Sequence, residues 1–248
     1  HRSTRVVTPT ETGLAFYERC LEILADLAEA ERSVTQLHAE PRGRLRVNAP
    51  MTFGTLHLSP ALADFLVQYP DLQVQLTLSD RFIDPLEEGF DVTVRISRPP
   101  ESSSLVTHEL MPSPRVLCAS PAYLAGHGVP QHPLDLRQHS CLRYGQLAAA
   151  GEWLLLGPDG SQAVTVEGVL CSNNGEVLKQ AAVEGLGITL LPTFIVAPEL
   201  QSGQLQIVLP DYRPPEIAVY VLYPVNRHLS TKIRLLVEFL KERFSPAF

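Results

Sequence analysis

The part of the chain that follows Gly43 alternates between two hydrophobic periods, and this alternation is the strongest constraint on the fold. In some segments apolar residues recur at every second position, which is the period of a half-buried strand. The segments between them have the length and pattern of helices. The resulting βαβαβ order implies a parallel sheet with right-handed crossovers. Strands are predicted at 44–49, 73–79 and 91–97, and helices at 56–68 and 83–88.

A second α/β unit follows a Pro/Ser-rich stretch at 98–104. It again alternates short apolar strands with helices, and an amphipathic helix over 230–243 closes the chain. Two α/β lobes joined by extended strands imply a cleft between them, and ligands bind at the strand carboxyl ends of such lobes. The strands of this unit are predicted at 116–119, 141–144, 153–156, 163–170, 188–191 and 217–223, and its helices after Ser120-Pro121 and at 175–184 and 194–200.

Residues 8–40 have the pattern of one long amphipathic helix. Thr8 is a candidate N-cap, Pro9 suits the first helical position, and Glu11 completes a capping box. Apolar residues then recur at three-four spacing as far as Pro41. A terminal helix of this length usually packs on a partner helix, so we expect it to pair two subunits; the alternative is a helix folded back on its own domain. The residues predicted to pair are Leu14, Tyr17, Leu21, Leu24 and Ala28.

Charge and composition argue against several classes of protein. A net charge of −7 over 248 residues means that any DNA-binding surface must be local or absent. The four cysteines are widely spaced, with no CxxC pair and no histidine cluster beside them, so we interpret them as small core residues and predict neither a metal site nor a disulfide framework. We find no signal peptide and no apolar run near the ~18 residues of a membrane span, so we predict a cytoplasmic protein that does not contact a membrane.

The sequence contains no recognisable catalytic motif. A nucleophile elbow, a Walker loop, an HExxH pair and a dinucleotide fingerprint are all missing. The run 185–187 has two glycines but no third at the fingerprint spacing, and it precedes a strand. We therefore predict that the protein is not an enzyme and uses no cofactor. The histidines interpreted as scattered surface residues are His57, His108, His127, His132, His139 and His228.

Four segments are expected to meet at the cleft, and the first is 50–54, between the first strand and its helix. A helix start offers free N–H groups and a positive dipole end, which favour an anion. Thr52 adds a hydroxyl and Phe53 an aromatic face. Pro60 indicates either a kink in this helix or a later start.

The second segment is the end of the third strand, with Arg95 and Ser97. By alternation Arg95 shares a face with Thr93 and Ser97, although which face meets the cleft stays open. Arginine suits bidentate binding of a carboxylate, and burying it on a covered sheet is unfavourable unless it is paired. Its partner is therefore either a ligand or a carboxylate of the chain, Asp91 or Asp80.

The second lobe contributes the other two segments. Asn173 and Asn174 precede the helix at 175–184, where asparagine is a good N-cap and can also face a ligand. The segments 142–144 and 192–194 would line the opposite wall. The complete set predicted to bind a ligand is Thr52, Phe53, Asp80, Arg95, Ser97, Tyr144, Asn173, Asn174, Pro192 and Phe194.

A series of short blocks runs in a fixed order along essentially the whole chain. HRSTR at 1–5 is followed by TPTETG at 8–13, LRVNAP at 45–50, GFDVTVR at 89–95 and GLGITLLP at 185–192, with Phe65 and Tyr69-Pro70 between them. In order and spacing these blocks resemble the LysR-type transcriptional regulators. The first two blocks match the end of the wing and the start of the linker helix in that family.

This resemblance implies an α/β fold of two Rossmann-like lobes with periplasmic-binding-protein type II architecture, preceded by a long linker helix. It also implies that most of a winged helix-turn-helix domain precedes His1 in a longer protein. Arg2 and Arg5 would then be the last DNA contacts of the wing, or a solvated tail. The implied domains are 1–7 as the wing end, 8–40 as the dimerisation helix, 44–110 with 226–248 as lobe I, and 111–225 as lobe II.

The resemblance also implies a function. The chain would be the dimerising and effector-sensing part of a transcriptional regulator that contacts DNA through the missing N-terminal domain and assembles as a homodimer or homotetramer. The implied effector is a small carboxylate, aromatic or another organic acid, bound between the lobes. The main alternative is a free-standing solute-binding protein of the same fold, which would need a secretion signal and no long helix. An enzyme of this fold, such as a deaminase, would need a catalytic constellation that we do not find.

Overall fold

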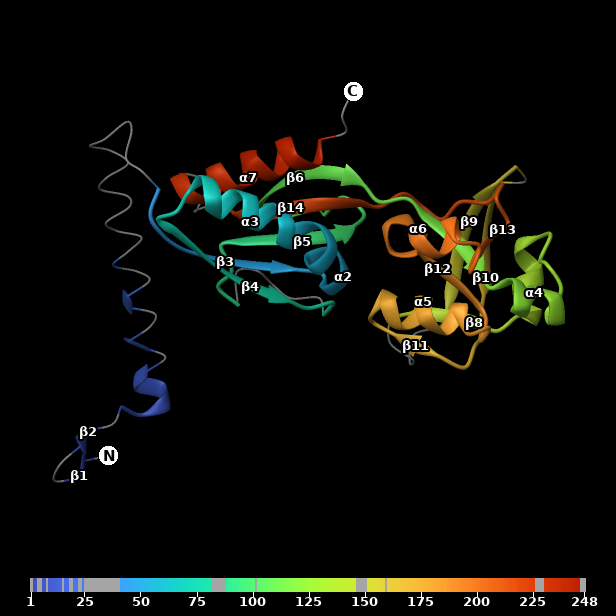
Figure 1. The fold of residues 1–248 in the computed structure, drawn as a ribbon, viewed down its shortest axis with the longest axis horizontal. Coiled ribbons are helices and arrows are strands. Elements are labelled where there is room, and N and C mark those ends of the chain that lie inside the picture. The colour runs from blue at the N-terminus through green and yellow to red at the C-terminus, as the bar shows by residue number, and fades with distance from the viewer. Residues whose placement is uncertain are drawn as a thin grey trace.

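The computed structural model describes residues 2–3, 6–7, 9–14, 16–17, 20–21, 24, 41–81, 88–100, 102–145, 151–158, 160–225 and 230–245. Within this part of the chain, two five-stranded sheets form two lobes that lie end to end (Figure 1). Among the described helices, none combines the length and the hydropathy that crossing a membrane requires.

The sheet of lobe I combines the predicted parallel unit with two strands from elsewhere in the chain. β3 pairs in parallel with both β4 and β5, which confirms the predicted βαβαβ pattern of strands. β14 then pairs antiparallel with β5 and with β6. In order across the sheet, the strands are β4 (Leu72–Leu78), β3 (Gly43–Ala49), β5 (Val92–Ser97), β14 (Ala218–Pro224) and β6 (Leu105–Pro112).

Two of these strands correct the sequence prediction. The predicted boundary at residue 225 placed 218–224 in lobe II, and this is wrong because β14 is an inner strand of the lobe I sheet. Its nearly continuous apolar run indicates a strand covered on both faces, but the run carries no information about which sheet receives it. β6 was not predicted at all, since it is an edge strand whose centre, from Thr107 to Glu109, is polar.

Two helices cover one face of the lobe I sheet, α3 (Ser59–Gln68) and α7 (Thr231–Phe244) (Figure 1). The helical backbone begins at Met51, earlier than predicted, and runs through α2 (Met51–Phe53) and a π-helical segment into α3. Pro60 follows the π-helical segment inside this continuous helical stretch, so the helix does not begin at Pro60, as one of the two interpretations held. The predicted helix at 83–88 lies almost entirely outside the described residues.

Lobe II has its own mixed sheet and a hairpin packed beside it. The predicted strand at 163–170 is displaced: the observed strand is the second arm of the hairpin and ends at Thr165. The sheet order is β11 (Cys171–Ser172), β8 (Cys141–Tyr144), β12 (Ile188–Pro192), β7 (Arg115–Ala119) and β13 (Gln206–Val208); the hairpin is β9 (Glu152–Gly157) and β10 (Gly160–Thr165); the helices are α4 (Pro121–His127), a 3-10 helix at Pro133–Gln138, α5 (Gly175–Val183) and α6 (Thr193–Gln201).

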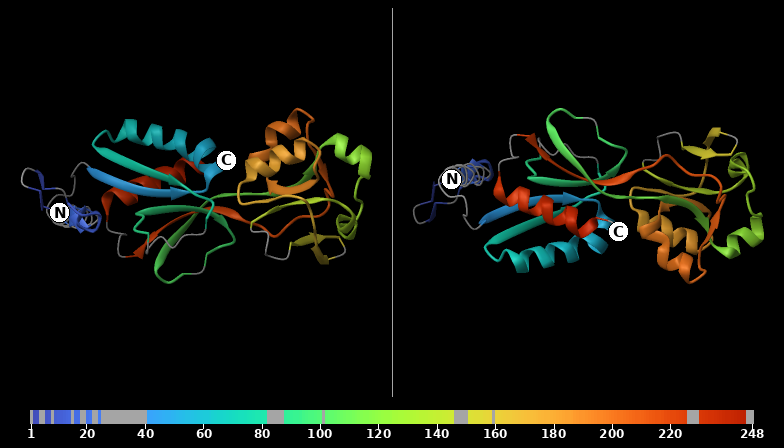
Figure 2. Two further views of the ribbon diagram at one scale, coloured as in Figure 1. Left: turned by 90° about the horizontal axis from the view of Figure 1, so that it is seen from below. Right: turned by 90° about the horizontal axis from the view of Figure 1, so that it is seen from above.

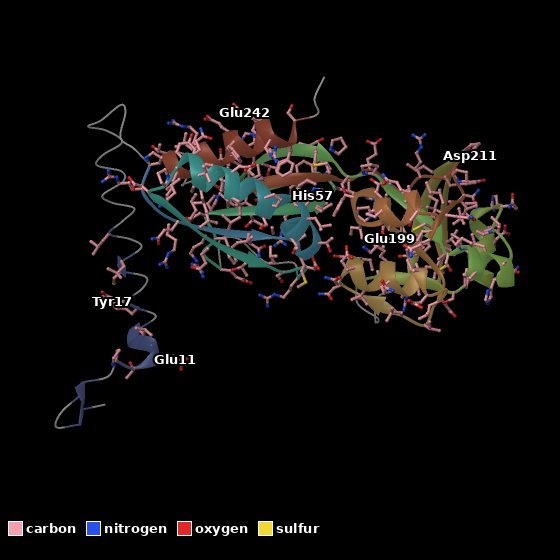
Figure 3. The ribbon with its side chains drawn as sticks, viewed as in Figure 1. Glu11, Tyr17, His57, Glu199, Asp211 and Glu242 are labelled. Atoms are coloured by element: carbon pink, nitrogen blue, oxygen red, sulfur yellow. The ribbon has the colours of Figure 1, made fainter. Side chains whose placement is uncertain are left out.

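The N-terminal residues stand apart from both lobes (Figure 1). A short antiparallel pair, β1 (Arg2–Ser3) and β2 (Val6–Val7), precedes helical residues at 11–14, 16–17, 20–21 and 24. Figure 3 shows Tyr17 on this helix, pointing away from the lobes. Arg5 and Ala28 lie outside the described residues. The exposed fractions of the other four predicted pairing residues are 48% for Leu14, 59% for Tyr17, 49% for Leu21 and 60% for Leu24.

Gly187 provides a test of how tightly lobe II is packed. A Cβ at this position would collide with the backbone carbonyl of Ser140, which cannot rotate away as a side chain can. We predict that Gly187→Ala lowers the free energy of unfolding by about 1–3 kcal/mol, measured by urea denaturation. Gly126→Ala in α4 is the control, because a Cβ there meets nothing and alanine favours a helix by roughly 1 kcal/mol. Equal losses in the two variants would contradict the packing argument.

Candidate effector site

Two extended segments connect the lobes, 113–115 and 213–217, and we call this pair the hinge. The segments are bonded to each other, since the Ser113 N–H donates to the Ile217 carbonyl at 2.9 Å. Figure 2 shows the chain passing between the lobes at this narrow crossing. The hinge therefore sets the spacing and orientation of the two lobes.

A cavity of about 730 Å³ lies between the lobes and reaches the hinge. This volume falls within the range of about 300–1,000 Å³ that is usual for small-molecule sites. Its walls come from the β3–α2 turn and the ends of β4 and β5 on one side, and from β8, β12 and the start of α6 on the other. The predicted residues that line it are Thr52, Phe53, Asp80, Arg95, Ser97, Tyr144, Pro192 and Phe194.

The two asparagines predicted for the site do not line the cavity. The Asn174 side chain accepts hydrogen bonds from the backbone N–H groups of Glu176 and Val177, at 3.0 and 3.3 Å, so it is the N-cap of α5. Its Nδ2 also donates to Asp80 Oδ2 at 3.4 Å and therefore joins the lobes. Asn173 is exposed. Asn174 thus acts as a cap and as a contact between the lobes.

Asp80 occupies the helix start that the sequence assigned to an external anion. The Met51 N–H donates to Asp80 Oδ1 at 2.8 Å, so a carboxylate of the chain already binds the first turn of α2. Thr52, in the same turn, is only 8% exposed, and its hydroxyl makes no hydrogen bond to the described residues. A ligand at this wall would meet the Thr52 hydroxyl, but it would have to displace Asp80 to reach the Met51 N–H.

Arg95 lines the cavity at the end of β5. Its Nη1 donates to the Arg81 carbonyl at 3.2 Å, which directs the guanidinium toward the end of β4. Partial burial lowers the pKa of Arg95, and the nearby charge of Glu88 opposes that effect. Asp91, one of the two candidate partners, accepts a hydrogen bond from the Arg46 N–H at 2.8 Å.

Sequence reasoning missed Arg115, a second partly buried arginine of the cavity. It begins β7, and its Nη2 donates to the Pro215 carbonyl at 2.9 Å. Its Nε is buried without a hydrogen-bond partner, and the guanidinium forms no ion pair with the described residues. Burial, followed by the positive charge of Arg98, lowers the pKa of Arg115. A cation at the first position of an apolar strand was the available signal, but it did not show that this strand begins at the cleft.

Other lining residues give the cavity an apolar and aromatic wall. Trp153, which was not predicted for the site, is 8% exposed and lines the lobe II side. Tyr144 lines the cavity from β8. Desolvation, followed by the negative charge of Asp80, raises the pKa of Tyr144 to about 12, so its hydroxyl remains a donor at neutral pH.

An aromatic contact also joins the lobes. Phe194, at the start of α6, packs against Phe53 and His57 of lobe I, with ring centroids 5.8 and 5.4 Å apart and near-perpendicular planes. The prediction that His57 is a surface residue is wrong, since it lies partly buried at the junction of the lobes (Figure 3). Burial lowers the pKa of His57, and its Nε2 is buried without a hydrogen-bond partner among the described residues.

Two of the four cysteines fit the prediction of small core residues, whereas Cys20 and Cys171 are only partly buried. Cys118 and Cys141 are buried and free, and burial raises the pKa of each thiol to about 12. In the part of the chain that the structure describes, His, Cys, Asp and Glu side chains form no group of three or more that could hold a metal ion.

Asn174 and Asn173 form a matched pair for testing the cap. We predict that Asn174→Ala lowers the free energy of unfolding by about 1 kcal/mol, because two N–H groups of α5 lose their acceptor. Asn173→Ala, one residue earlier and exposed, should change it by less than about 0.5 kcal/mol. Urea unfolding of both variants measures the difference, and a larger loss at Asn173 would refute the assignment of the cap.

Comparisons with known proteins agree with this architecture. The family described as LysR substrate binding domain matches residues 38–245. An uncharacterised HTH-type transcriptional regulator of Haemophilus influenzae is 37% identical over 94% of this chain and 80% of its own length. The HTH-type transcriptional activator TtdR of Escherichia coli is 36% identical over 97% of this chain and 77% of its own length.

Solved structures of the same family have the same fold. Full-length AphB, a virulence activator of Vibrio cholerae, is 31% identical with a TM-score of 0.73, over 98% of this chain and 83% of that one. CrgA of Neisseria meningitidis is 28% identical with a TM-score of 0.74, over 99% of this chain and 83% of that one. These matches confirm the predicted two-lobed α/β fold, and the curated relatives are transcriptional regulators, as predicted, and not enzymes. The chain therefore belongs to the LysR family of transcriptional regulators and contains the effector-binding domain of that family.

Proposed function

We propose that this chain is the dimerising and effector-sensing part of its regulator, and that a small carboxylate binds between the lobes. The observation that carries the proposal is the cavity of about 730 Å³ whose walls come from both lobes and from the hinge. A ligand held there contacts all three at once. Its binding energy therefore depends on how the lobes are arranged.

The lining favours an organic acid. Arg95 and Arg115 are partly buried cations, and the planar guanidinium can bind a carboxylate with two parallel hydrogen bonds. Thr52 and Tyr144 add hydroxyl donors, and Trp153 offers apolar surface to a carbon skeleton. This mixture of a few charged groups with an apolar wall is typical of sites for small organic anions.

The ligand would act by selecting one arrangement of the lobes. Such a shift requires that it bind one arrangement more tightly than the other. In the whole regulator, a helix-turn-helix domain of the kind named in the relatives would contact DNA, with residues 1–7 as the end of its wing. The helix over 8–40 would pair two subunits into a homodimer, and further contacts between lobes would give a homotetramer.

Pairing through the N-terminal helix can be tested at Leu21. A leucine side chain contributes about 1.5–3 kcal/mol when it is fully buried, so Leu21→Glu should raise the dissociation constant of the dimer at least about tenfold. Sedimentation velocity over a range of protein concentrations measures this change. Val169→Glu, at an exposed apolar position of lobe II, is the control. Unchanged dimerisation of Leu21→Glu would exclude pairing through this face.

Ligand binding can be tested by thermal-shift screening of small carboxylates. A ligand present at 100 times its dissociation constant stabilises the folded protein by about 2.7 kcal/mol. We expect that stabilisation to fall in Arg95→Ala and Thr52→Ala. The controls are Arg234→Ala and Thr55→Ala, which remove an exposed arginine of α7 and an exposed threonine that follows Thr52 in the same helix. If the acids stabilise the wild type and both cavity variants equally, the proposed site is wrong.

A further inference from the structure

The cationic groups of the cavity lie in two separate places. Arg95 is bonded to the Arg81 carbonyl and so belongs to the end formed by β4 and α2. Arg98 follows β5, and its charge acts on Arg115, which is bonded to the hinge. Three residues of extended chain span about 10 Å, so Arg95 and Arg98 are well separated along one wall.

Arg115 is unfavourably placed without an external partner. Its guanidinium is partly buried, forms no ion pair with the described residues, and has a like charge beside it. Removing a cation from water is unfavourable unless an anion compensates it. One Nη atom donates to the Pro215 carbonyl, whereas Nε is buried and no described residue forms a hydrogen bond with it. An anion beside this guanidinium would relieve the repulsion from Arg98.

The hinge end of the cavity has the surroundings of a binding site. Trp153 and Pro215 supply apolar surface. Glu152 also lines the cavity, but it is exposed and forms no ion pair with Arg115.

We propose that the effector carries two carboxylates, and that Arg115, with Arg98, holds the second one at the hinge end of the cavity. This inference rests on the proposed function, in which the first carboxylate lies near Arg95 and Thr52. A dicarboxylate can reach both ends of the cavity, whereas a monocarboxylate of the same length leaves Arg115 uncompensated. Arg115 is therefore the residue that determines specificity for a second charge.

The position of Arg115 links the second carboxylate to the hinge. Its backbone belongs to the segment 113–115, and its guanidinium is bonded to Pro215 of the segment 213–217. A carboxylate bound there contacts a side chain that joins the two segments. A dicarboxylate would therefore act on the hinge directly, in addition to bridging the cavity walls.

Matched pairs of acids test the inference by titration calorimetry of the full chain. The pairs are succinate and butyrate, glutarate and valerate, and adipate and hexanoate. A hydrogen bond between charged groups predicts that at least one diacid binds the wild type about 10-fold to 100-fold more tightly than its monoacid. Arg115→Gln should abolish this preference and leave monoacid binding unchanged. Arg115→Lys keeps the charge without the planar fork, so it should retain part of the preference.

Two further variants separate binding from folding. Arg98→Gln leaves the bond between Arg115 and Pro215 in place, and it should reduce the preference for diacids without lowering the thermal stability of the free protein. Arg137→Gln removes an exposed arginine of lobe II that does not line the cavity, and it should change nothing.

The inference is overturned if diacids and monoacids bind the wild type equally, or if Arg115→Gln weakens both members of a pair by the same factor. In either case the proposed function survives as long as monoacid binding depends on Arg95 and Thr52. If Arg95→Ala and Thr52→Ala leave monoacid binding intact, or if no acid of either series binds, then the proposed carboxylate site itself fails.

Discussion

The relative position of the two lobes depends mainly on the hinge, two antiparallel segments of extended chain. The Ser113 N–H bonds to the Ile217 carbonyl, and Arg115 bonds to the Pro215 carbonyl, so backbone and side chain both tie the segments together. β7 begins where one segment enters lobe II, and β14 begins where the other enters lobe I. The hinge therefore positions the walls of the cavity. Arg115, whose charged side chain lines the cavity, forms one of the hydrogen bonds within the hinge.

Beyond the hinge, the described contacts between the lobes are few and weak. The aromatic contact of Phe194 with Phe53 is worth about 0.5–1.5 kcal/mol beyond the apolar area that it buries. The bond from Asn174 to Asp80 adds a net free energy of about 0.5–1.5 kcal/mol at most, because it is long and lies near solvent. A ligand whose binding free energy differs by about 1.4 kcal/mol between two arrangements of the lobes changes their ratio tenfold. This difference is similar in size to each of these contacts, so a few interactions across the cavity suffice to favour one arrangement.

Much of the cavity could be predicted because it depends on local rules. Strand ends, helix starts and the polar residues beside them point to one place in a parallel α/β lobe, and Thr52, Arg95 and Tyr144 indeed line one cavity. The helix start was predicted correctly as a position that attracts an anion, but the anion in the structure is Asp80. No sequence pattern shows that a carboxylate 29 residues away will reach that turn. Arg115 was missed for the same reason, because its role depends on where two segments that are far apart in the chain cross.

By itself, the sequence determined most of the strands and helices, although not β6, the parallel pairing of β3 with β4 and β5, and the resemblance to the LysR family. These properties follow from the spacing of hydrophobic residues and from short sequence motifs, and both can be read from neighbouring residues in the chain. Only the tertiary structure decided that β14 joins the first sheet, that Asp80 binds the start of α2, and that Arg115 lies in the hinge without an ion pair to the described residues. Each of these depends on contacts between residues far apart in the chain, which no local pattern of the sequence specifies.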